Sequence, residues 1–123
     1  MANEIRVGVN LSCVNGNFLS NQDYTTEVDQ TTEGGGNPGT VSVATAYAQI
    51  SGLADMTNEG YCAARNLDDT NYLEIGVEVA ATFYPLIKLK AGEIGVFRLT
   101  PGVGVFARAN TAACRLHFWC LED

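Results

Sequence analysis

The chain has 123 residues, enough for one domain with its own hydrophobic core. Hydrophobic residues make up 46% and charged residues 17%, which excludes a disordered chain. No run approaches the roughly 18 apolar residues of a membrane helix, and the net charge of −7 has the wrong sign for gripping a phosphate backbone. We therefore expect a folded domain that binds neither nucleic acid nor membrane.

The N-terminal segment predicts a β-hairpin. Apolar residues alternate with polar ones from Ile5 to Cys13, the pattern of a strand with one dry face. Asn15-Gly16 follows, a pair that tolerates the positive φ angles of a tight hairpin turn. The return segment, residues 18–32, is long and polar. Its alternation is weaker than that of the first strand.

A glycine-rich segment follows the hairpin. Residues 34–39 read GGGNPG, with four glycines and one proline. Glycine and proline together disfavour regular structure, so this segment predicts a flexible elbow. We expect one domain in two parts: an arm with its elbow over residues 1–39 and a body over residues 40–123.

The body predicts short strands separated by turn residues, with no long helix. A short helical turn near residues 52–57 is compatible with the pattern, and Pro85 indicates an edge strand or a bulge. This spacing is typical of an all-β, antiparallel β-sandwich, and we expect a jelly roll of eight or nine short strands. The expected body strands are residues 41–50, 60–65, 72–79, 82–90, 93–99, 103–109 and 114–121.

The segment RNLDDTNYLEIG, residues 65–76, is dense in polar groups and has three interpretations: a calcium loop, a catalytic acid/base pair or a polar turn. A calcium loop needs acids at alternate positions, a glycine at the sixth and a glutamate at the twelfth, and counting from Asp68 breaks that pattern. Adjacent Asp68 and Asp69 project in different directions, which makes a poor acid/base pair. Such residues accept backbone hydrogen bonds in turns. We therefore favour a polar turn over a calcium site.

No other group of residues predicts catalysis or metal binding. His117 is the one histidine, which excludes metal centres built from several imidazoles. Cys114 and Cys120 lie on the opposite face of its predicted strand, which disfavours Cys–His catalysis. We expect no enzyme activity, no cofactor and no metal. The N-terminus lacks an apolar signal-peptide core, so we expect all four cysteines, Cys13 and Cys62 included, to be buried free thiols.

Two groups of residues are candidates for an interface. In the last strand, Arg115, His117 and Trp119 share the face opposite the cysteines, and Trp and Arg are enriched at interface centres. The arm or a loop of the same chain could equally cover Trp119. The arm is acidic, with Asp23, Glu27 and Asp29 on its return segment. This acidity predicts either a solubilising surface or a docking face for a basic partner.

Residues 59–123 resemble small virion proteins of tailed bacteriophages. The resemblance rests on RNLDDTNYLEIG and on GEIGVFRLTPGVGVFARANTAACRLHFWCLED, which match turn-and-strand signatures of such proteins. It brings no catalytic residues. It implies a virion protein assembled in the host cytoplasm that decorates or cements the capsid between capsid subunits. A small tail component is the alternative, and a homotrimer is the implied oligomer.

A carbohydrate-binding module is the competing class, because such modules are also β-sandwiches. Trp119 and the tyrosines could stack on sugar rings. The sequence lacks several aromatic residues at even spacing on one strand face, which argues against this class. The tyrosines concerned are Tyr61, Tyr72 and Tyr84.

Overall fold

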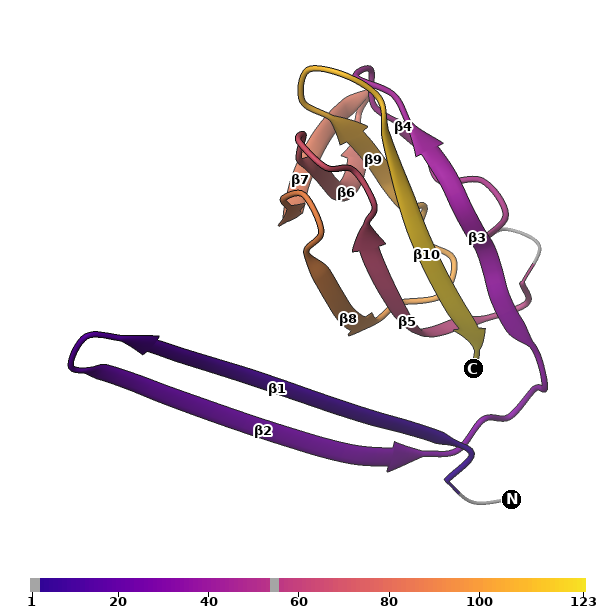
Figure 1. Cartoon of the computed structure of the whole chain (residues 1–123). Coiled ribbons are helices and arrows are strands. Elements are labelled where there is room, and N and C mark those ends of the chain that lie inside the picture. The colour runs from indigo at the N-terminus through magenta and orange to yellow at the C-terminus, as the bar shows by residue number, and fades with distance from the viewer. Residues whose placement is uncertain (1–2, 54–55) are drawn as a thin grey trace. The chain divides into compact units, whose positions relative to one another are not determined.

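The computed structural model describes residues 3–53 and 56–123, which form ten β-strands (Figure 1). The chain separates into two compact units, Met1–Glu33 and Gly34–Asp123. Within the described residues no helix is long and apolar enough to cross a membrane. The strands are β1 (Ile5–Asn15), β2 (Phe18–Val28), β3 (Gly35–Val43), β4 (Ala48–Gln49), β5 (Glu59–Asn66), β6 (Leu73–Val79), β7 (Thr82–Leu89), β8 (Ile94–Arg98), β9 (Phe106–Ala109) and β10 (Cys114–Glu122).

The first unit is the predicted hairpin arm. Strands β1 and β2 have 11 residues each and pair antiparallel along their whole length, without a bulge. The register runs from Ile5 opposite Val28 to Asn15 opposite Phe18. Gly16 in the turn has φ +58°, a conformation that glycine adopts without steric cost. The hairpin prediction is confirmed.

The second unit is an antiparallel sandwich of two four-stranded sheets. One sheet has the order β3-β10-β5-β8 and the other β4-β9-β6-β7. All pairings between these strands are antiparallel. The chain passes back and forth between the sheets (Figure 1). Among the described strands of this unit, β6 and β7 alone are consecutive in the chain and pair directly. The prediction of an all-β antiparallel sandwich is confirmed.

The core lies between the two sheets of this unit. Strand β10 alternates buried and more exposed residues, with Leu116 and Phe118 fully buried. Leu73 and Ile75 of β6 face them from the other sheet as part of the same apolar cluster. Each such side chain contributes about 1.5–3 kcal/mol to stability when it is removed from water. Because alternate residues of β10 point to opposite sides of the sheet, Arg115, His117 and Trp119 lie on its outer face.

The elbow predicted for residues 34–39 is wrong. Gly35 to Gly39 belong to strand β3, which pairs with β10. All four glycines of residues 34–39 have positive φ angles, and a β-carbon on Gly36 would stand 2.8 Å from the Trp119 ring. Glycine within a strand often marks a place where another group approaches closely, and here that group is an indole ring. The arm therefore ends before residue 34.

Other predicted boundaries need smaller corrections. The predicted strand 41–50 is two strands, β3 and β4, and the strand predicted at 103–109 begins at Phe106. Pro85 lies on edge strand β7 beside a register shift between Ile75 and Gly76, as predicted for an edge or bulge. The helical turn predicted at 52–57 falls partly on residues 54–55, which lie outside the described residues.

Candidate interaction surfaces

The polar segment RNLDDTNYLEIG forms a turn held by Asn66 and Asp68. Asn66 is fully buried and donates to the carbonyls of Asn71 at 2.9 Å and Leu89 at 3.0 Å. Its oxygen accepts from the Asp68 amide at 3.0 Å. Asp68 in turn accepts from the amides of Thr70 at 2.9 Å and Asn71 at 2.6 Å. The prediction of a polar turn is confirmed, although Asn66 was missed as its buried anchor.

The electrostatics of this turn fit a structural role. Backbone hydrogen bonds from Asn71 and Thr70 lower the pKa of Asp68 below its ordinary value. Its carboxylate oxygen Oδ2 therefore already holds two amide donors. Across residues 3–53 and 56–123, no group of three or more His, Cys, Asp or Glu side chains is arranged to hold a metal ion. Asp68 thus orders the loop between β5 and β6.

The four cysteines are free, but they differ in burial. Cys62, Cys114 and Cys120 are buried, whereas Cys13 is exposed, so the prediction of burial is wrong for Cys13. Cys13 lies on the apolar side of the arm, as its parity predicts, but it is exposed there. Cys62 and Cys120 lie directly opposite each other on β5 and β10. Their hydrogen bond, followed by burial, raises the pKa of the Cys62 thiol.

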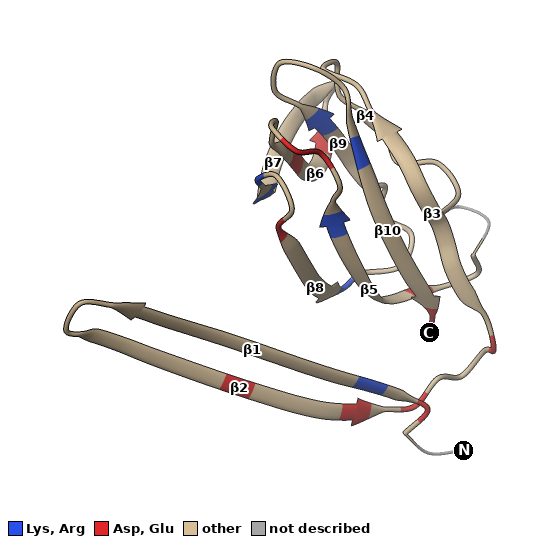
Figure 2. Cartoon of the chain, in the orientation of Figure 1, with Lys and Arg blue, Asp and Glu red and all other residues tan. Residues whose placement is uncertain are grey.

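The outer face of the β3-β10-β5-β8 sheet brings the predicted C-terminal residues together with others that sequence reasoning missed. Strand register places His117 beside Arg65 and Trp119 beside Ala63. Basic side chains lie on three of its strands (Figure 2). We call this surface the Trp119 face and define it by Tyr61, Ala63, Arg65, Ile94, Val96, Arg98, Arg115, His117 and Trp119.

Trp119 is partly covered by its own sheet and partly open. Its ring lies against Gly36 of β3, and the His117 ring stands 5.8 Å away, centroid to centroid, tilted by 32°. The side chain nevertheless remains 49% exposed. Exposed Val96 (41%) and Ile94 (67%) extend the apolar area along β8. Trp119 is therefore held in place while a large part of it stays available for contact.

The tyrosines named for sugar stacking lie in different settings. The guanidinium of Arg98 lies 4.7 Å above the Tyr61 ring, and the Lys88 ammonium lies 4.1 Å above the Tyr72 ring. A cation over the ring occupies the face that a sugar would need. Tyr84 on β7 is 51% exposed. Only Trp119 and Tyr84 of the four aromatic residues offer open rings, and they belong to different sheets.

The arm has two unlike faces. We call one the uncharged face. Of its residues, Val9 is 36%, Leu11 69% and Phe18 61% exposed. Ile5 is buried, while Val7 and Val28 are partly buried. By the β1–β2 register this face comprises Ile5, Val7, Val9, Leu11, Cys13, Asn15, Phe18, Ser20, Gln22, Tyr24, Thr26 and Val28.

The opposite side of the arm, the charged face, carries two of the predicted acids. Asp23 and Glu27 lie there, and Glu27 pairs with Arg6 at 3.3 Å. Asp29 lies beyond the strand end and accepts from the Asn3 amide at 2.6 Å. The predicted acids therefore do not form one cluster, because Asp29 is engaged with the base of the hairpin. Only Asp23 and Glu27 are placed to meet a basic partner together.

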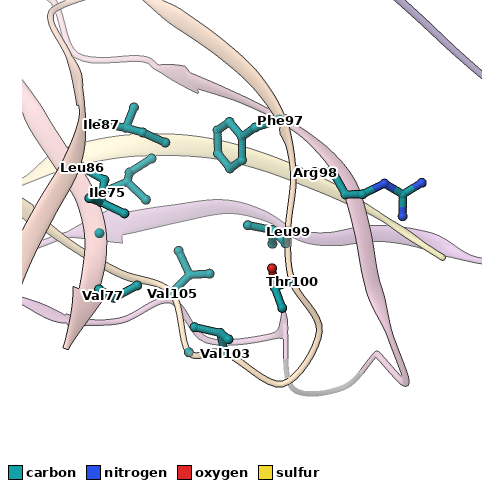
Figure 3. Close-up of a pocket in the computed structure, with 12 residues that line it drawn as sticks. Ile75, Val77, Leu86, Ile87, Phe97, Arg98, Leu99, Thr100, Val103 and Val105 are labelled. Carbon is teal, nitrogen blue, oxygen red and sulfur yellow. The ribbon is translucent and has the colours of Figure 1, made fainter. Parts of the chain in front are cut away.

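An apolar hollow of about 320 Å³ lies within the second unit, between strands β6, β7 and β8. Leu86, Ile87, Phe97 and Leu99 surround it, whereas the Arg98 side chain points away (Figure 3). Small-molecule sites usually add a few convergent polar groups to an apolar lining. Thr100 provides the one hydroxyl among the lining residues. The hollow is an opening between the two sheet edges and lacks a catalytic set.

No protein-family model, curated protein or solved structure matches this chain. The functional argument therefore rests on the chain's own surfaces. Two of them stand out: the uncharged face of the arm and the Trp119 face of the body.

Proposed function

We propose that this protein is a structural component of a bacteriophage particle that binds between capsid subunits as a decoration or cement protein. The role is structural and needs no cofactor. One observation carries the proposal: a separate 33-residue unit exposes a long apolar face. The resemblance of residues 59–123 to small virion proteins supplies the kind of particle. The location is then the virion, after assembly in the host cytoplasm.

The arm is built for contact with another molecule. An isolated two-stranded hairpin is marginal in water, because too little apolar surface is buried to offset its ordering. Here Leu11, Phe18 and Tyr24 are each more than 60% exposed. Contiguous exposed apolar surface of this kind marks an interaction site. A neighbouring molecule that covers this face would stabilise the hairpin and gain affinity from the same burial.

The architecture of the body supports a finer proposal, a jelly roll. Its eight strands divide into sheets of order β3-β10-β5-β8 and β4-β9-β6-β7. Both sheets are fully antiparallel, and nearly every connection crosses from one sheet to the other. Eight strands in two such sheets fit the jelly-roll arrangement, which viral capsid and lectin domains share.

The Trp119 face is our candidate for the capsid contact. It holds Arg65, Arg98 and Arg115, three of the seven basic residues of a chain whose net charge is −7. Arginine and tryptophan are enriched among residues that dominate binding energy. A basic, aromatic face of this kind suits an acidic surface on a capsid or tail protein. Asp23 and Glu27 on the arm provide the opposite charge for a basic neighbour.

A small tail component is the alternative within the same class, since the same surfaces serve either position. A carbohydrate-binding module is less well supported, because cations lie over the Tyr61 and Tyr72 rings. A glycan array separates these classes. We expect no glycan to bind, and strong binding of one glycan that is lost in Trp119→Ala would favour the module.

Binding to particles tests the proposal. Phage particles prepared without this protein are mixed with the purified chain and sedimented. We expect the full chain to sediment with the particles and Trp119→Ala to bind about tenfold or more weakly, the scale of a central interface residue. Tyr84→Ala, which removes an exposed aromatic side chain of the other sheet, is the matched control and should bind normally. Failure of the full chain to sediment with capsids or tails would overturn the proposal.

A further inference from the structure

We infer that the uncharged face of the arm is a self-association surface, and that it packs against the same face of a second copy of this chain. The inference deepens the proposed function, on which it rests for its biological setting, by naming the partner of the arm. Three observations carry it: which residues share the face, where the arm's charges lie, and how much area the face offers.

The face continues without interruption toward the tip of the hairpin. By the β1–β2 register Val9, Leu11 and Phe18 lie on this face, and each is exposed. The charged face carries one exposed apolar pair near the tip, Val14 opposite Leu19. Its polar members are uncharged, and Tyr24 donates from its hydroxyl to Gln22 on the same side at 3.2 Å. A surface that is apolar and uncharged gains most from meeting another surface of the same kind.

The charged side chains of β1 and β2 all lie away from the uncharged face. A basic partner would find no opposite charge from these strands there, whereas a second copy could pack on it without burying a charge. Residues 1–33 contain five acids (Glu4, Asp23, Glu27, Asp29, Glu33) and one base (Arg6), a net charge of −4. The charged side chains of both strands, Arg6, Asp23 and Glu27, lie on the charged face. Two arms packed through their uncharged faces keep these groups on the outside. Packed sheets stand about 10 Å apart and the Debye length is about 8 Å, so the repulsion is largely screened.

The available area predicts weak, concentration-dependent association. Strands of 11 residues at about 3.3 Å per residue give a face about 36 Å long, and two strands make it about 10 Å wide. Each copy thus offers roughly 360 Å² of flat area. Two such faces together bury roughly 720 Å², less than the roughly 1,200–2,000 Å² of specific stable interfaces, so we expect a weak contact. On a particle that holds many copies close together, the high local concentration would favour this contact between arms.

Cys13 is a built-in reporter for this contact. Its side chain lies on the uncharged face and is exposed, while the other three cysteines are buried. A thiol-alkylating reagent applied to the folded chain therefore reads out Cys13 selectively. We expect the alkylation rate of Cys13 to fall about tenfold between about 1 µM and about 300 µM protein, because copies that associate cover the thiol. A rate independent of concentration would overturn the inference.

Two substitutions at neighbouring positions test which face of the arm makes the contact. Leu11→Glu puts a charge on the uncharged face, and Ser12→Glu puts the same charge on the charged face, both at exposed positions of β1. We expect Leu11→Glu to weaken self-association about tenfold or more and to restore fast Cys13 alkylation. Ser12→Glu should change neither. Equal effects of the two substitutions on sedimentation would contradict the inference.

The outcome is distinguishable from that of the proposed function. Self-association is measured on the purified chain, and particle binding is measured by sedimentation with capsids. A chain that self-associates through Leu11 but never binds particles would overturn the virion role and leave this inference standing. A chain that binds particles while Cys13 stays equally reactive at every concentration would overturn this inference and leave the virion role standing. Higher salt should strengthen the association, since it screens the acidic arms from each other.

Discussion

The indole ring of Trp119 lies against Gly36, in space that the β-carbon of any other residue at position 36 would occupy. A β-carbon at residue 36 would stand 2.8 Å from Cζ2 of the ring, closer than real side chains approach. Gly36 also has φ +88°. The glycine-rich strand β3 therefore leaves the space that the indole ring of the Trp119 face occupies. This relationship ties the segment GGGNPG to the proposed interface.

Gly36→Ala should displace the Trp119 ring, whereas Gly39→Ala should leave it in place. Both glycines have φ near +90°, so each substitution costs about 1–2 kcal/mol of backbone strain. Only at residue 36 does the new methyl group meet the ring, because Gly39 has open space around it. Overpacking adds about 1–3 kcal/mol. Fluorescence of Trp119, the single tryptophan, should shift to the red in Gly36→Ala alone, and equal spectra for the two variants would contradict this seating.

Asn66→Ala should destabilise the body by about 3 kcal/mol. The substitution removes three hydrogen bonds that the fully buried side-chain amide makes with the backbone. Each backbone partner then loses its hydrogen bond to this side chain, which costs stability. Urea unfolding measures the loss. Asp69→Ala, at an exposed position of the same turn, is the control and should change stability little. Comparable losses in the two variants would show that Asn66 does not anchor the turn.

Acid should remove the contribution of Asp68 to stability. Its folded-state pKa lies below the ordinary value of 3.8, because two backbone amides bind the carboxylate. The stability it provides is therefore fully present above that value and is lost as the pH falls through the lower folded pKa. Asp68→Ala should have a lower urea midpoint than the native chain at about pH 7, and the gap should shrink toward about pH 2.5. A gap that does not change with pH would contradict this assignment.

Thiol titration should find four reduced cysteines in the unfolded chain and one fast-reacting thiol in the dilute folded chain. Cys62, Cys114 and Cys120 are buried, and burial raises the pKa of the Cys114 thiol, which slows its reaction. Cys13→Ser should abolish the fast phase and leave the three slow thiols unchanged. Fewer than four thiols after denaturation without reductant would contradict the prediction that all four cysteines are reduced.

Much of the fold follows from the sequence, because its strands alternate with period two and its turns carry typical residues. The pair Asn15-Gly16 marks the hairpin, and the alternation in residues 114–121 correctly places the cysteines inside and Trp119 outside. The failures share one cause. Local pattern does not reveal a distant partner, so the glycine-rich first part of β3 was predicted as an elbow. Its glycines are explained by the close approach of Trp119 of β10.

The candidate surfaces were predicted only in part for the same reason. Parity assigns Cys13 to the apolar side of its strand but cannot tell whether another element covers that side. The sequence likewise gives Arg115, His117 and Trp119 as neighbours, whereas Arg65 and Arg98 join them only through strand pairing. Asn66 carries no sequence signal that distinguishes it from other turn residues. Its role depends on the carbonyl of Leu89, which comes from another strand.

A density map of the intact phage particle tests the central claim most directly. The account predicts a β-domain of this 13.1 kDa chain at the junctions between capsid subunits, with the Trp119 face toward the capsid protein. Arms of adjacent copies should meet through their uncharged faces. A capsid map in which every junction is filled by the capsid protein alone would contradict the claim.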